Sequence, residues 1–451
     1  MNNVYVICPA HVVTGGVELL HQLAYKLNLL GINAYIYYIN PSNVKASVPA
    51  VYLKYNVRIA EEIDDKSDNL IIFPEVYIPY IKSIKNAKCV LWWLSVDNAV
   101  GSKEDFDYVL NNKELIHFSQ SEYSTQMLLS HQIPNERIYW LCDYINSEFL
   151  HLNNNSDKEK VREDVVLFNP KKGFQKTASI ISKSNGFIKW QALAGFTPAQ
   201  MRKVLSNAKV YIDFGNHPGR DRIPREATMC GCCLITNRMG SAANKIDVAI
   251  DEKYKFDVDA SDEEILETIY KLISNYDNEK EEYAEYCHRS AEEFKSFETD
   301  LLSIFENYFT IFEKKYTESE LLNIIENHIE NEEYNMAYPF IIKYRLEKYT
   351  ENTHFTKLEA DVRIALGEYH EAEYIVKEGL KNAPNDYDLM LLWAKALLKM
   401  NCVEDFMQCI EKCRSAMNMS KGTEDENRVV MTAMSYIEII NNFISEANTK
   451  Q

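Results

Sequence analysis

The N-terminal segment up to residue 40 constrains the fold more than any other part of the chain. The run VYVICPA at residues 4–10 is rich in β-branched side chains, which favours a β-strand. After HVVTGG, the segment VELLHQLAYKLNLLG repeats leucine at helical spacing and stops at Gly31, which predicts a helix. A second strand, NAYIYYIN, follows at residues 33–40. Strand, glycine turn, helix and strand form a βαβ unit, which requires a parallel sheet.

The same alternation continues through the first third of the chain. Further strands are predicted at residues 69–75, 88–95, 115–121 and 138–145. Alternating strands and helices with short connections indicate an α/β domain with a parallel sheet. We therefore expect a Rossmann-like domain at residues 1–150.

A second α/β domain is predicted after a polar segment. Residues 151–164, HLNNNSDKEKVRED, lack periodicity and read as a linker. The new series has a helix from Thr197 to Asn207. Its strands are predicted at residues 165–170, 188–195, 209–215 and 232–237. We expect this Rossmann-like domain to span residues 160–280.

The last part of the chain is predicted to be helical. Acidic amphipathic helices at 281–316 connect to a region at 317–451 that contains an internal repeat. Tyr334 and Ala337 recur 35 residues later as Tyr369 and Ala372, close to the period of about 34 residues of tetratricopeptide repeats. A third copy is weaker because Phe406 stands where alanine is expected. The alternative is a plain helical bundle.

Repeats of this kind stack into surfaces that bind a protein partner or a second copy of the chain. Aromatic side chains commonly anchor such contacts. The predicted anchors are Tyr344, Tyr349, Tyr374 and Trp393.

Composition excludes several classes of protein. With 451 residues, the chain is expected to contain several domains, and no apolar run approaches the roughly 20 residues that cross a bilayer. The start lacks the pattern of a secretory signal, so we expect a cytoplasmic protein whose ten cysteines are reduced thiols. The formal charge of −18, from 67 acidic and 49 basic residues, argues against nucleic acid as a partner.

The glycine turn TGGVE at residues 14–18 is a candidate phosphate site. Amide groups of Gly15 and Gly16 would lie at a helix N-terminus, where unpaired N–H donors and the helix dipole favour an anion. The alternative is a tight turn with no ligand. The turn does not match GxGxxG, which argues against a nicotinamide dehydrogenase.

Basic side chains follow two strands of the second domain. Lys171 and Lys172, in NPKKGFQKT, come directly after its first strand, and Arg220 and Arg222 follow a later one. Cations at the carboxyl ends of parallel strands can neutralise a diphosphate. The alternative is that these loops are merely solvated.

The segment HPGRDRIPREATMCGCC at residues 217–233 changes abruptly from charged to small side chains. We expect Glu226 in the first turn of a helix, where its carboxylate could accept hydrogen bonds from the hydroxyls of a ribose. Cys230, Cys232 and Cys233 are expected to be buried thiols, because no second ligand pair at suitable spacing is present for a metal.

Two of these segments resemble GT-B glycosyltransferases of the large retaining group often called family 4. They are VYVICPAHVVTGGVELLHQLAYKLNLLGINAYIY, with its GG-x-E turn, and PGRDRIPREATMCGCCLITNRMGSA. The resemblance covers about residues 1–300. It implies a nucleoside diphosphate sugar bound by the second domain, an acceptor bound by the first, and no metal ion or other cofactor. It also implies that Glu226 grips the ribose and that Lys171 or Lys172 contacts the diphosphate.

The chain departs from this family at one position. A glutamate is common eight residues before Glu226, and Pro218 stands here instead, with His217 and Asp221 nearby as further catalytic candidates. The sugar and the stereochemistry therefore stay open, and an inverting enzyme would need a general base in the first domain.

The candidates for acceptor contact or for this base are His11, Glu18, Glu75 and Asp97. The acceptor could be a glycan, a lipid-linked molecule or a protein. The alternative to an enzyme is a non-catalytic sugar or nucleotide sensor, or a repeat scaffold with a vestigial transferase body.

Overall fold

The computed structural model describes residues 1–40, 46–150, 161–349 and 352–449. The chain up to Ile311, apart from a short stretch near residue 150, forms one compact unit, and the chain from Phe312 forms a second. Most of the predicted linker at 151–164 lies outside the described residues. Residues from Glu163 onward belong to a strand.

The first unit contains two parallel sheets, and the N-terminal sheet has seven strands in the order β3-β2-β1-β4-β5-β6-β7. From β1 the chain adds strands β2 and β3 on one side of the sheet and then β4 to β7 on the other side. This reversal of the strand order beside β1 is typical of a doubly wound Rossmann-like sheet. Its strands are β1 (Asn3–Pro9), β2 (Asn33–Ile39), β3 (Arg58–Ile59), β4 (Leu70–Pro74), β5 (Lys88–Trp93), β6 (Ile116–Ser119) and β7 (Ile138–Trp140). Its main helices are α1 (Gly15–Leu29), α2 (Ile78–Ile81), α3 (Lys103–Asn111) and α4 (Glu122–Ser130).

The predicted strands of this sheet are confirmed, with two differences. The short strand β3 was not predicted, because two exposed residues carry no periodic signal. The strand expected at 138–145 ends at Trp140, since β7 is an edge strand that pairs only with β6. The apolar residues after it are buried outside the sheet, which explains why they resembled strand.

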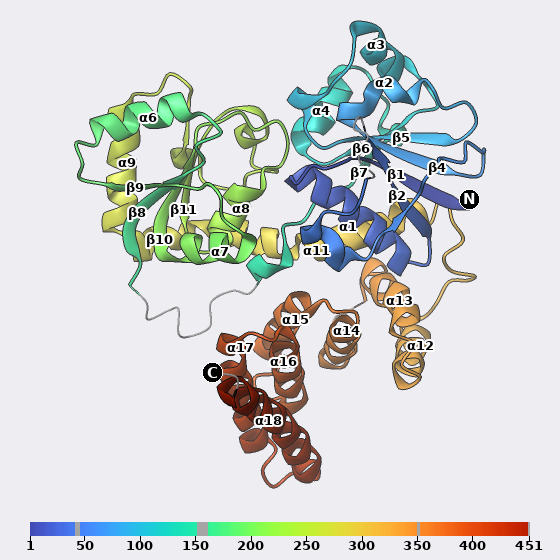
Figure 1. The fold of residues 1–451 in the computed structure, drawn as a ribbon, viewed down its shortest axis with the longest axis vertical. Coiled ribbons are helices and arrows are strands. Elements are labelled where there is room, and N and C mark those ends of the chain that lie inside the picture. The colour runs from blue at the N-terminus through green and yellow to red at the C-terminus, as the bar shows by residue number, and fades with distance from the viewer. Residues whose placement is uncertain (41–45, 151–160, 350–351, 450–451) are drawn as a thin grey trace. The chain divides into compact units, whose positions relative to one another are not determined.

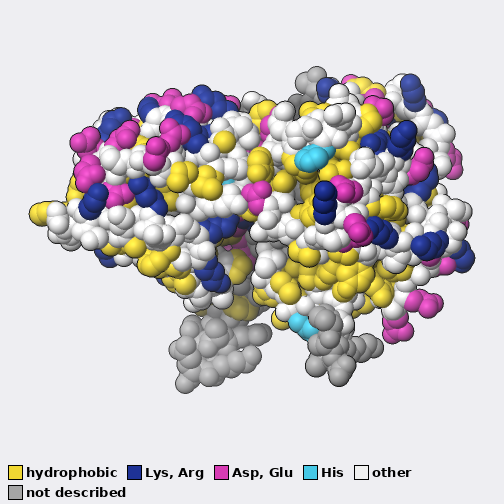
Figure 2. All heavy atoms as spheres, turned by 90° about the horizontal axis from the view of Figure 1, so that it is seen from above, with side chains coloured by type: hydrophobic (Ala, Val, Ile, Leu, Met, Phe, Trp, Pro, Cys, Tyr) yellow, Lys and Arg dark blue, Asp and Glu magenta, His cyan; other side chains and the backbone are white. Residues whose placement is uncertain are grey.

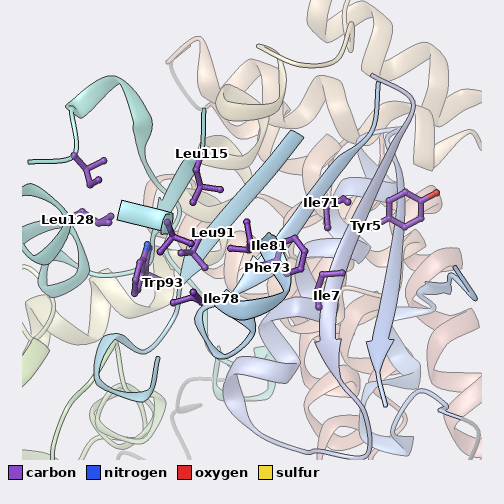
Figure 3. Packing of buried hydrophobic residues seen from close by; sticks show 12 residues of the cluster. Tyr5, Ile7, Ile71, Phe73, Ile78, Ile81, Leu91, Trp93, Leu115 and Leu128 are labelled. Carbon is purple, nitrogen blue, oxygen red and sulfur yellow. The ribbon is translucent and has the colours of Figure 1, made fainter. Parts of the chain in front are cut away.

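Packing of the central strands produces the N-terminal core, shown in Figure 3. Ile7, Phe73 and Trp93 belong to β1, β4 and β5, and all three are buried. Helix α2 adds Ile78 and Ile81 to the same cluster. Strands covered on both faces need apolar residues in a nearly continuous run, and LIIFP in β4 has that composition.

The second sheet has five strands in the order β12-β11-β10-β8-β9, again all parallel. They are β8 (Glu163–Phe168), β9 (Lys189–Ala192), β10 (Ala208–Asp213), β11 (Cys233–Asn237) and β12 (Lys255–Phe256). The flanking helices are α6 (Phe174–Lys183), α7 (Pro198–Asn207), α8 (Arg222–Met229) and α9 (Asp262–Ser274). Helix α7 begins after Thr197 as predicted, because its hydroxyl accepts the amide of Gln200. Cys230, Cys232 and Cys233 are buried free thiols, which confirms that prediction.

After the second sheet, α10 (Tyr276–Glu279) leads into the long helix α11 (Ala284–Phe305), which contacts both sheets' domains (Figure 1). Helix α11 packs on α8. Further along, Phe297 lies 5.2 Å from Tyr144 between ring centroids, and Glu298 forms a buried ion pair with Lys26 of α1 at 2.7 Å. The helix therefore connects the second α/β domain to the first.

Among its described residues the second unit has helices and no strands, as expected. Its described helices are α12 (Glu318–Glu330), α13 (Tyr334–Leu346), α14 (Thr353–Ala365), α15 (Tyr369–Asn382), α16 (Tyr387–Met400), α17 (Val403–Met419) and α18 (Glu426–Thr449). Successive helices pack on one another, and Ala337 and Ala372 of the predicted repeat are fully buried.

Two predicted aromatic anchors of this unit are wrong. Tyr344 and Tyr374 are buried, and the ring of Tyr344 stacks on Phe355 at 4.1 Å. Both belong to the core, because helical repeats stack by burying large side chains between neighbouring helices. Trp393 is half-buried and donates to Glu373 at 3.1 Å.

No described helix is long and apolar enough to cross a membrane. On the face shown in Figure 2, Lys and Arg side chains are interspersed with Asp and Glu. This face offers no continuous basic tract, in line with the net charge.

Two leucines of the N-terminal domain test the packing. Replacing Leu91, which is 0% exposed in β5, by alanine leaves a cavity and should lower the free energy of unfolding by about 2–5 kcal/mol. The same change at Leu53, 63% exposed, should cost no more than about 0.5 kcal/mol. Denaturant unfolding of both variants measures the difference, and equal losses would contradict the described core.

Candidate functional site

The candidate site lies at the carboxyl ends of two neighbouring strands, β8 and β10. The turn after β8 carries Lys171 and Lys172, and the loop between β10 and α8 carries His217 and Asp221. Because these strands are parallel and paired, both loops leave the same edge of the sheet. The ammonium of Lys172 lies 2.6 Å from the Asp221 carboxylate and joins the two loops.

A glycine makes this contact between the loops possible. Gly173, just before α6, has a left-handed φ of 57°. A Cβ at this residue would lie 2.2 Å from the carbonyl oxygen of Phe214. Only glycine fits there, so the lysine turn is held against the chain that leaves β10.

His217 is buried between two carboxylates. Its Nδ1 lies 2.7 Å from Asp221 and its Nε2 lies 3.8 Å from Asp213, at the end of β10. Burial opposes protonation, but Asp221 and Asp213 outweigh it and raise the pKa of His217. Burial likewise opposes ionisation of Asp221, yet His217 and Lys172 lower its pKa. Asp213, His217, Asp221 and Lys172 therefore lie in one row of titratable groups that ends at Lys172.

Asp213, His217 and Asp221 also have the residue types and the closeness of a metal site, with ligand atoms within 4.8 Å of one another. Two contacts argue against that role. Nδ1 of His217 is already at hydrogen-bond distance from Asp221, and the Lys172 ammonium occupies the other oxygen of that carboxylate. A cation would have to displace the positive charge of Lys172, so the residues fit a row of polar contacts that ends at Lys172 better.

Glu226 lies in the second turn of α8, and the expectation that it would occupy the first turn is wrong. The helix begins at Arg222 and has no acidic residue in its first turn. The Glu226 carboxyl is buried and makes no hydrogen bond or ion pair with any residue that the structure describes. Burial raises the pKa of Glu226 to about 7, against the opposing effect of Arg222 and Arg225.

The arginines of this segment form internal ion pairs. Arg225 is 0% exposed and bonds Asp143 at 2.7 Å and Glu293 of α11 at 2.5 Å. Arg220, predicted to bind the donor, also pairs with Glu293. Both guanidinium groups therefore connect α8 and its preceding loop to α11, and Arg225 also reaches the chain that follows β7.

Arg222 connects the two motifs that the sequence analysis singled out. Its guanidinium lies 2.6 Å from Glu18 of α1 and donates to Gln22 at 3.1 Å. A Cβ at Gly15 would lie 3.0 Å from Arg222 Cδ, so the side chain crosses the glycine turn closely. Burial opposes ionisation of Glu18, but Arg222 and Lys54 lower its pKa.

The loop before α8 also contacts the N-terminal domain after β5. The carbonyl of Pro218 accepts the amide of Val96 at 2.7 Å, and Asn216 donates to Asp97 at 2.8 Å. A Cβ at Gly219 would lie 2.1 Å from the carbonyl oxygen of Leu94. Glycine is required at residue 219 because the two backbones touch.

The remaining base candidates differ in their surroundings. Glu75 is buried and accepts the amide of Leu94 at 3.1 Å, and burial raises its pKa to about 7. Asp97 is exposed and accepts the Tyr123 hydroxyl at 2.9 Å. His11 is exposed in the loop after β1. Of these three, only Asp97 hydrogen-bonds the 216–221 loop.

Sequence reasoning missed three charged residues of this network. Asp213 could have been found, because it lies near the carboxyl end of the strand predicted at residues 209–215, at the same edge as the lysines. Asp143 follows a strand that was predicted too long. Glu293 resembled a surface acid of an amphipathic helix, and no local signal distinguished it.

Comparison with known proteins identifies the class of fold. The two Rossmann-like sheets, joined by α11, have the GT-B architecture of glycosyltransferases, which confirms the predicted fold. No family model matches the chain, and no curated protein matches it.

Two solved glycosyltransferase structures illustrate the similarity. A glycosyltransferase from Rickettsia africae ESF-5 has a TM-score of 0.52 and 14% identity, over 70% of this chain and 99% of that one. HepE from Anabaena, in complex with UDP-glucose, has a TM-score of 0.51 and 11% identity, over 68% of this chain and 99% of its own. At such identities the likeness shows the fold alone.

Removing the Arg225 guanidinium tests the buried network. Arg225→Leu leaves Asp143 and Glu293 without their main cation, so the free energy of unfolding should fall by about 3–5 kcal/mol. The control is Arg238→Leu, which removes a half-exposed pair with Glu252 and should cost about 1 kcal/mol or less. Denaturant unfolding measures both, and a small loss at Arg225 would contradict the assignment.

The raised pKa of Glu226 predicts a pH-dependent effect of Glu226→Gln. An unfolded glutamate ionises near about 4.3, whereas the folded carboxyl holds its proton to about 7. The folded state binds more protons between these values, so this carboxyl destabilises the wild type as pH rises. The variant lacks the effect and should gain stability relative to wild type from pH 5 to pH 8.

The matched control for this prediction is Glu267→Gln, at an exposed position of α9. It should change stability by less than about 0.5 kcal/mol at both pH values. A difference between wild type and Glu226→Gln that does not grow with pH would show that the carboxyl ionises normally.

Proposed function

We propose that the chain is a glycosyltransferase that moves a sugar from a nucleoside diphosphate sugar to an acceptor. The observation that carries the proposal is the buried carboxyl of Glu226, which has no partner among the described residues. It lies in the same domain of a GT-B fold as Lys171 and Lys172, which follow strand β8. HepE, which has the same fold, was solved with UDP-glucose. A donor of this kind offers a ribose and a diphosphate, which match a carboxyl acceptor and a cation pair.

In this proposal the lysines act on the leaving group. Lys171 is exposed and pairs with no acid among the described residues, while Lys172 is held in place by Asp221. Charge develops on the diphosphate as the glycosidic bond breaks. A preorganised ammonium lowers the energy of that state, which is usually the largest electrostatic contribution to such catalysis.

The glycine turn gives a second set of donors. The amides of Gly15 and Gly16 are the first of α1 and have no acceptor among the described residues. Arg222 lies beside them, with its charge balanced by Glu18. We assign these groups to an anionic part of the substrate, either the diphosphate or a phosphate on the acceptor.

The acceptor belongs to the N-terminal domain in this proposal and is a glycan, a lipid-linked molecule or a protein. Asp97 is the best placed base for an inverting reaction, since it is exposed and contacts the 216–221 loop through Asn216. Lysine and arginine side chains supply the positive charge that a metal ion would otherwise provide. Transfer is therefore proposed to be independent of divalent metal.

A non-catalytic sensor is the second candidate, and one observation favours it. Pro218 stands where the family often has a glutamate, and its carbonyl bonds Val96 of the other domain. That position is thus occupied by a contact between domains. A sensor would bind the nucleotide sugar without turning it over.

Two substitutions test the donor site. Lys172→Ala should weaken binding of the matching nucleoside diphosphate by about 1.5–3 kcal/mol, the range for hydrogen bonds to charged groups. Glu226→Ala should abolish turnover of the sugar donor, because it removes the proposed ribose acceptor. Calorimetry and product release from UDP-, GDP- and TDP-sugars, with and without EDTA, measure these effects.

The control is Lys189→Ala, which removes an exposed lysine that pairs with Glu163 at the other end of the same sheet. It should leave binding and turnover unchanged, and EDTA should have no effect on the wild type. Failure of every nucleotide to bind would contradict the proposal. Binding without any turnover or transfer would favour the sensor.

A further inference from the structure

The N-terminal domain contains a cavity of about 430 Å³. It lies beside the first halves of β1 and β2 and the chain that follows β3. The glycine turn that the transferase proposal uses lies at the opposite, carboxyl end of β1. The described residues that line the cavity are Asn3, Tyr5, Tyr35, Ala60, Glu61 and Glu62. The volume falls in the range of roughly 300–1,000 Å³ that is usual for small-molecule sites.

Two neighbouring tyrosines form the aromatic part of the lining. Tyr5 and Tyr35 are partners in the register of β1 and β2, and their rings stack with centroids 5.9 Å apart. Arg58 is the partner of Tyr35 on β3, and its guanidinium carbon lies 5.7 Å from the centre of that ring. Strand pairing and stacking therefore hold both rings in place before any ligand binds.

The hydroxyl of Tyr5 is the observation that points to a ligand. The side chain is only 6% exposed, and its hydroxyl makes no hydrogen bond with any residue that the structure describes. In Figure 3 this hydroxyl points away from Ile71 and the rest of the core cluster. Nearly all buried polar groups in native proteins have a partner, which is protein, ordered water or a ligand. The cavity beside Tyr5 is where such a partner fits.

The other polar groups of the lining are mainly hydrogen-bond acceptors. Asn3 donates to the side-chain oxygen of Asn69 through its own side-chain amide at 3.2 Å and through its backbone amide at 3.1 Å. No described residue donates to the side-chain oxygen of Asn3. Glu62 pairs with no cation among the described residues, and no lysine, arginine or histidine is among the described lining residues. The described lining is therefore negatively charged and short of donors.

The segment that carries the two glutamates is held at both ends. The amide of Ala60 donates to the carbonyl of Ile36 at 2.9 Å, which fixes the start of the segment on β2. Asp65 accepts the three backbone amides of residues 85–87 at distances between 2.7 and 2.9 Å. The fold therefore positions the backbone of this wall of the cavity.

These groups select a ligand by its charge and by its donors. A carboxylate repels a phosphate or a nucleotide, and a neutral sugar does not compensate the charge of Glu62. A primary ammonium has three donors, no acceptor and a positive charge, so it matches carboxylate, carbonyl and hydroxyl oxygens. Cations also gain energy from contact with tyrosine rings.

We propose that this cavity binds an aliphatic amine, a small molecule with at least one protonated primary amino group. Its ammonium group donates to Glu62, to the side-chain oxygen of Asn3 and to the hydroxyl of Tyr5. Its carbon chain lies along the ring of Tyr35. The proposal does not depend on the transferase activity, because no residue assigned to the sugar donor is among the described lining residues.

Calorimetric titration of the full chain with putrescine and with spermidine tests this inference. The buffer contains about 0.15 M NaCl, which screens attraction to the formal charge of −18 beyond about 8 Å. Each amine should show saturable binding at one site. Glucose, N-acetylglucosamine, MgCl₂ and CaCl₂ are titrated alongside. Absence of saturable amine binding, or tighter binding of a sugar or a divalent cation, would overturn the proposal.

Glu62→Lys tests whether the amine binds in this cavity. The change replaces an attractive charge by a repulsive one and should weaken spermidine binding at least about tenfold. The matched control is Glu281→Lys, which makes the same change at an exposed residue that does not line the cavity. Its affinity should stay within about twofold of wild type, since the new charge is screened. Equal losses in both variants would show that only net charge matters and would contradict the site.

Tyr5→Phe tests the buried hydroxyl while keeping the ring. Spermidine binding should weaken by about twofold to tenfold, the range for one neutral hydrogen bond. The temperature of thermal unfolding without ligand should not fall, because the hydroxyl has no partner among the described residues. Tyr270→Phe, at an exposed position of α9, is the control and should change neither quantity. Unchanged affinity in Tyr5→Phe would contradict the proposed contact.

A short peptide with one lysine separates a free amine from a protein side chain. It should bind more weakly than spermidine, because the peptide backbone does not enter a cavity of this size. Tighter binding of the peptide would assign the cavity to a lysine of a partner protein and would overturn the small-molecule proposal. Circular dichroism confirms that each variant is folded, and Glu62→Gln repeats the charge test with a milder change.

Discussion

The buried guanidinium of Arg225 is the interaction on which the candidate site depends. It bonds Asp143 after β7, Glu293 on α11 and the backbone carbonyls of Arg220 and Asp221. A charge without exposure is tolerated only when its donors are paired, so α8, α11 and the end of the first domain must keep these relative positions. Arg225 also stabilises the conformation of the loop before α8, because it donates hydrogen bonds to the carbonyls of Arg220 and Asp221.

This network divides the charges of the 217–226 segment into two groups. Arg220 pairs with Glu293, and Arg225 pairs with both Glu293 and Asp143, so both arginines are structural in their contacts. Asp221 binds Lys172 and His217 at the edge of the sheet, and Glu226 has no partner among the described residues. A dense cluster of charge in the sequence thus separates into a buried scaffold and a smaller set of groups that can meet a ligand.

The helical unit follows a different physical rule. Its aromatic residues are used to pack helices together, as the stacking of Tyr344 on Phe355 shows. Ion pairs of Asp361 and Asp388 join its alternate helices α14, α16 and α18. Contacts of this kind depend on which residues the helix order brings to one face, because residues about one repeat apart become neighbours.

The sequence by itself determined the βαβ order, the helix start at Thr197 and the buried cysteines, because periodicity, caps and small residues act over a few positions. It also placed Lys171 and Lys172 at a strand end. Only the tertiary structure decided that Arg222 crosses Gly15, that Glu293 pairs with Arg220, and that Glu226 is buried with no partner among the described residues. Those facts join residues tens to hundreds of positions apart, and the energy of a charge depends on its surroundings in space rather than along the chain.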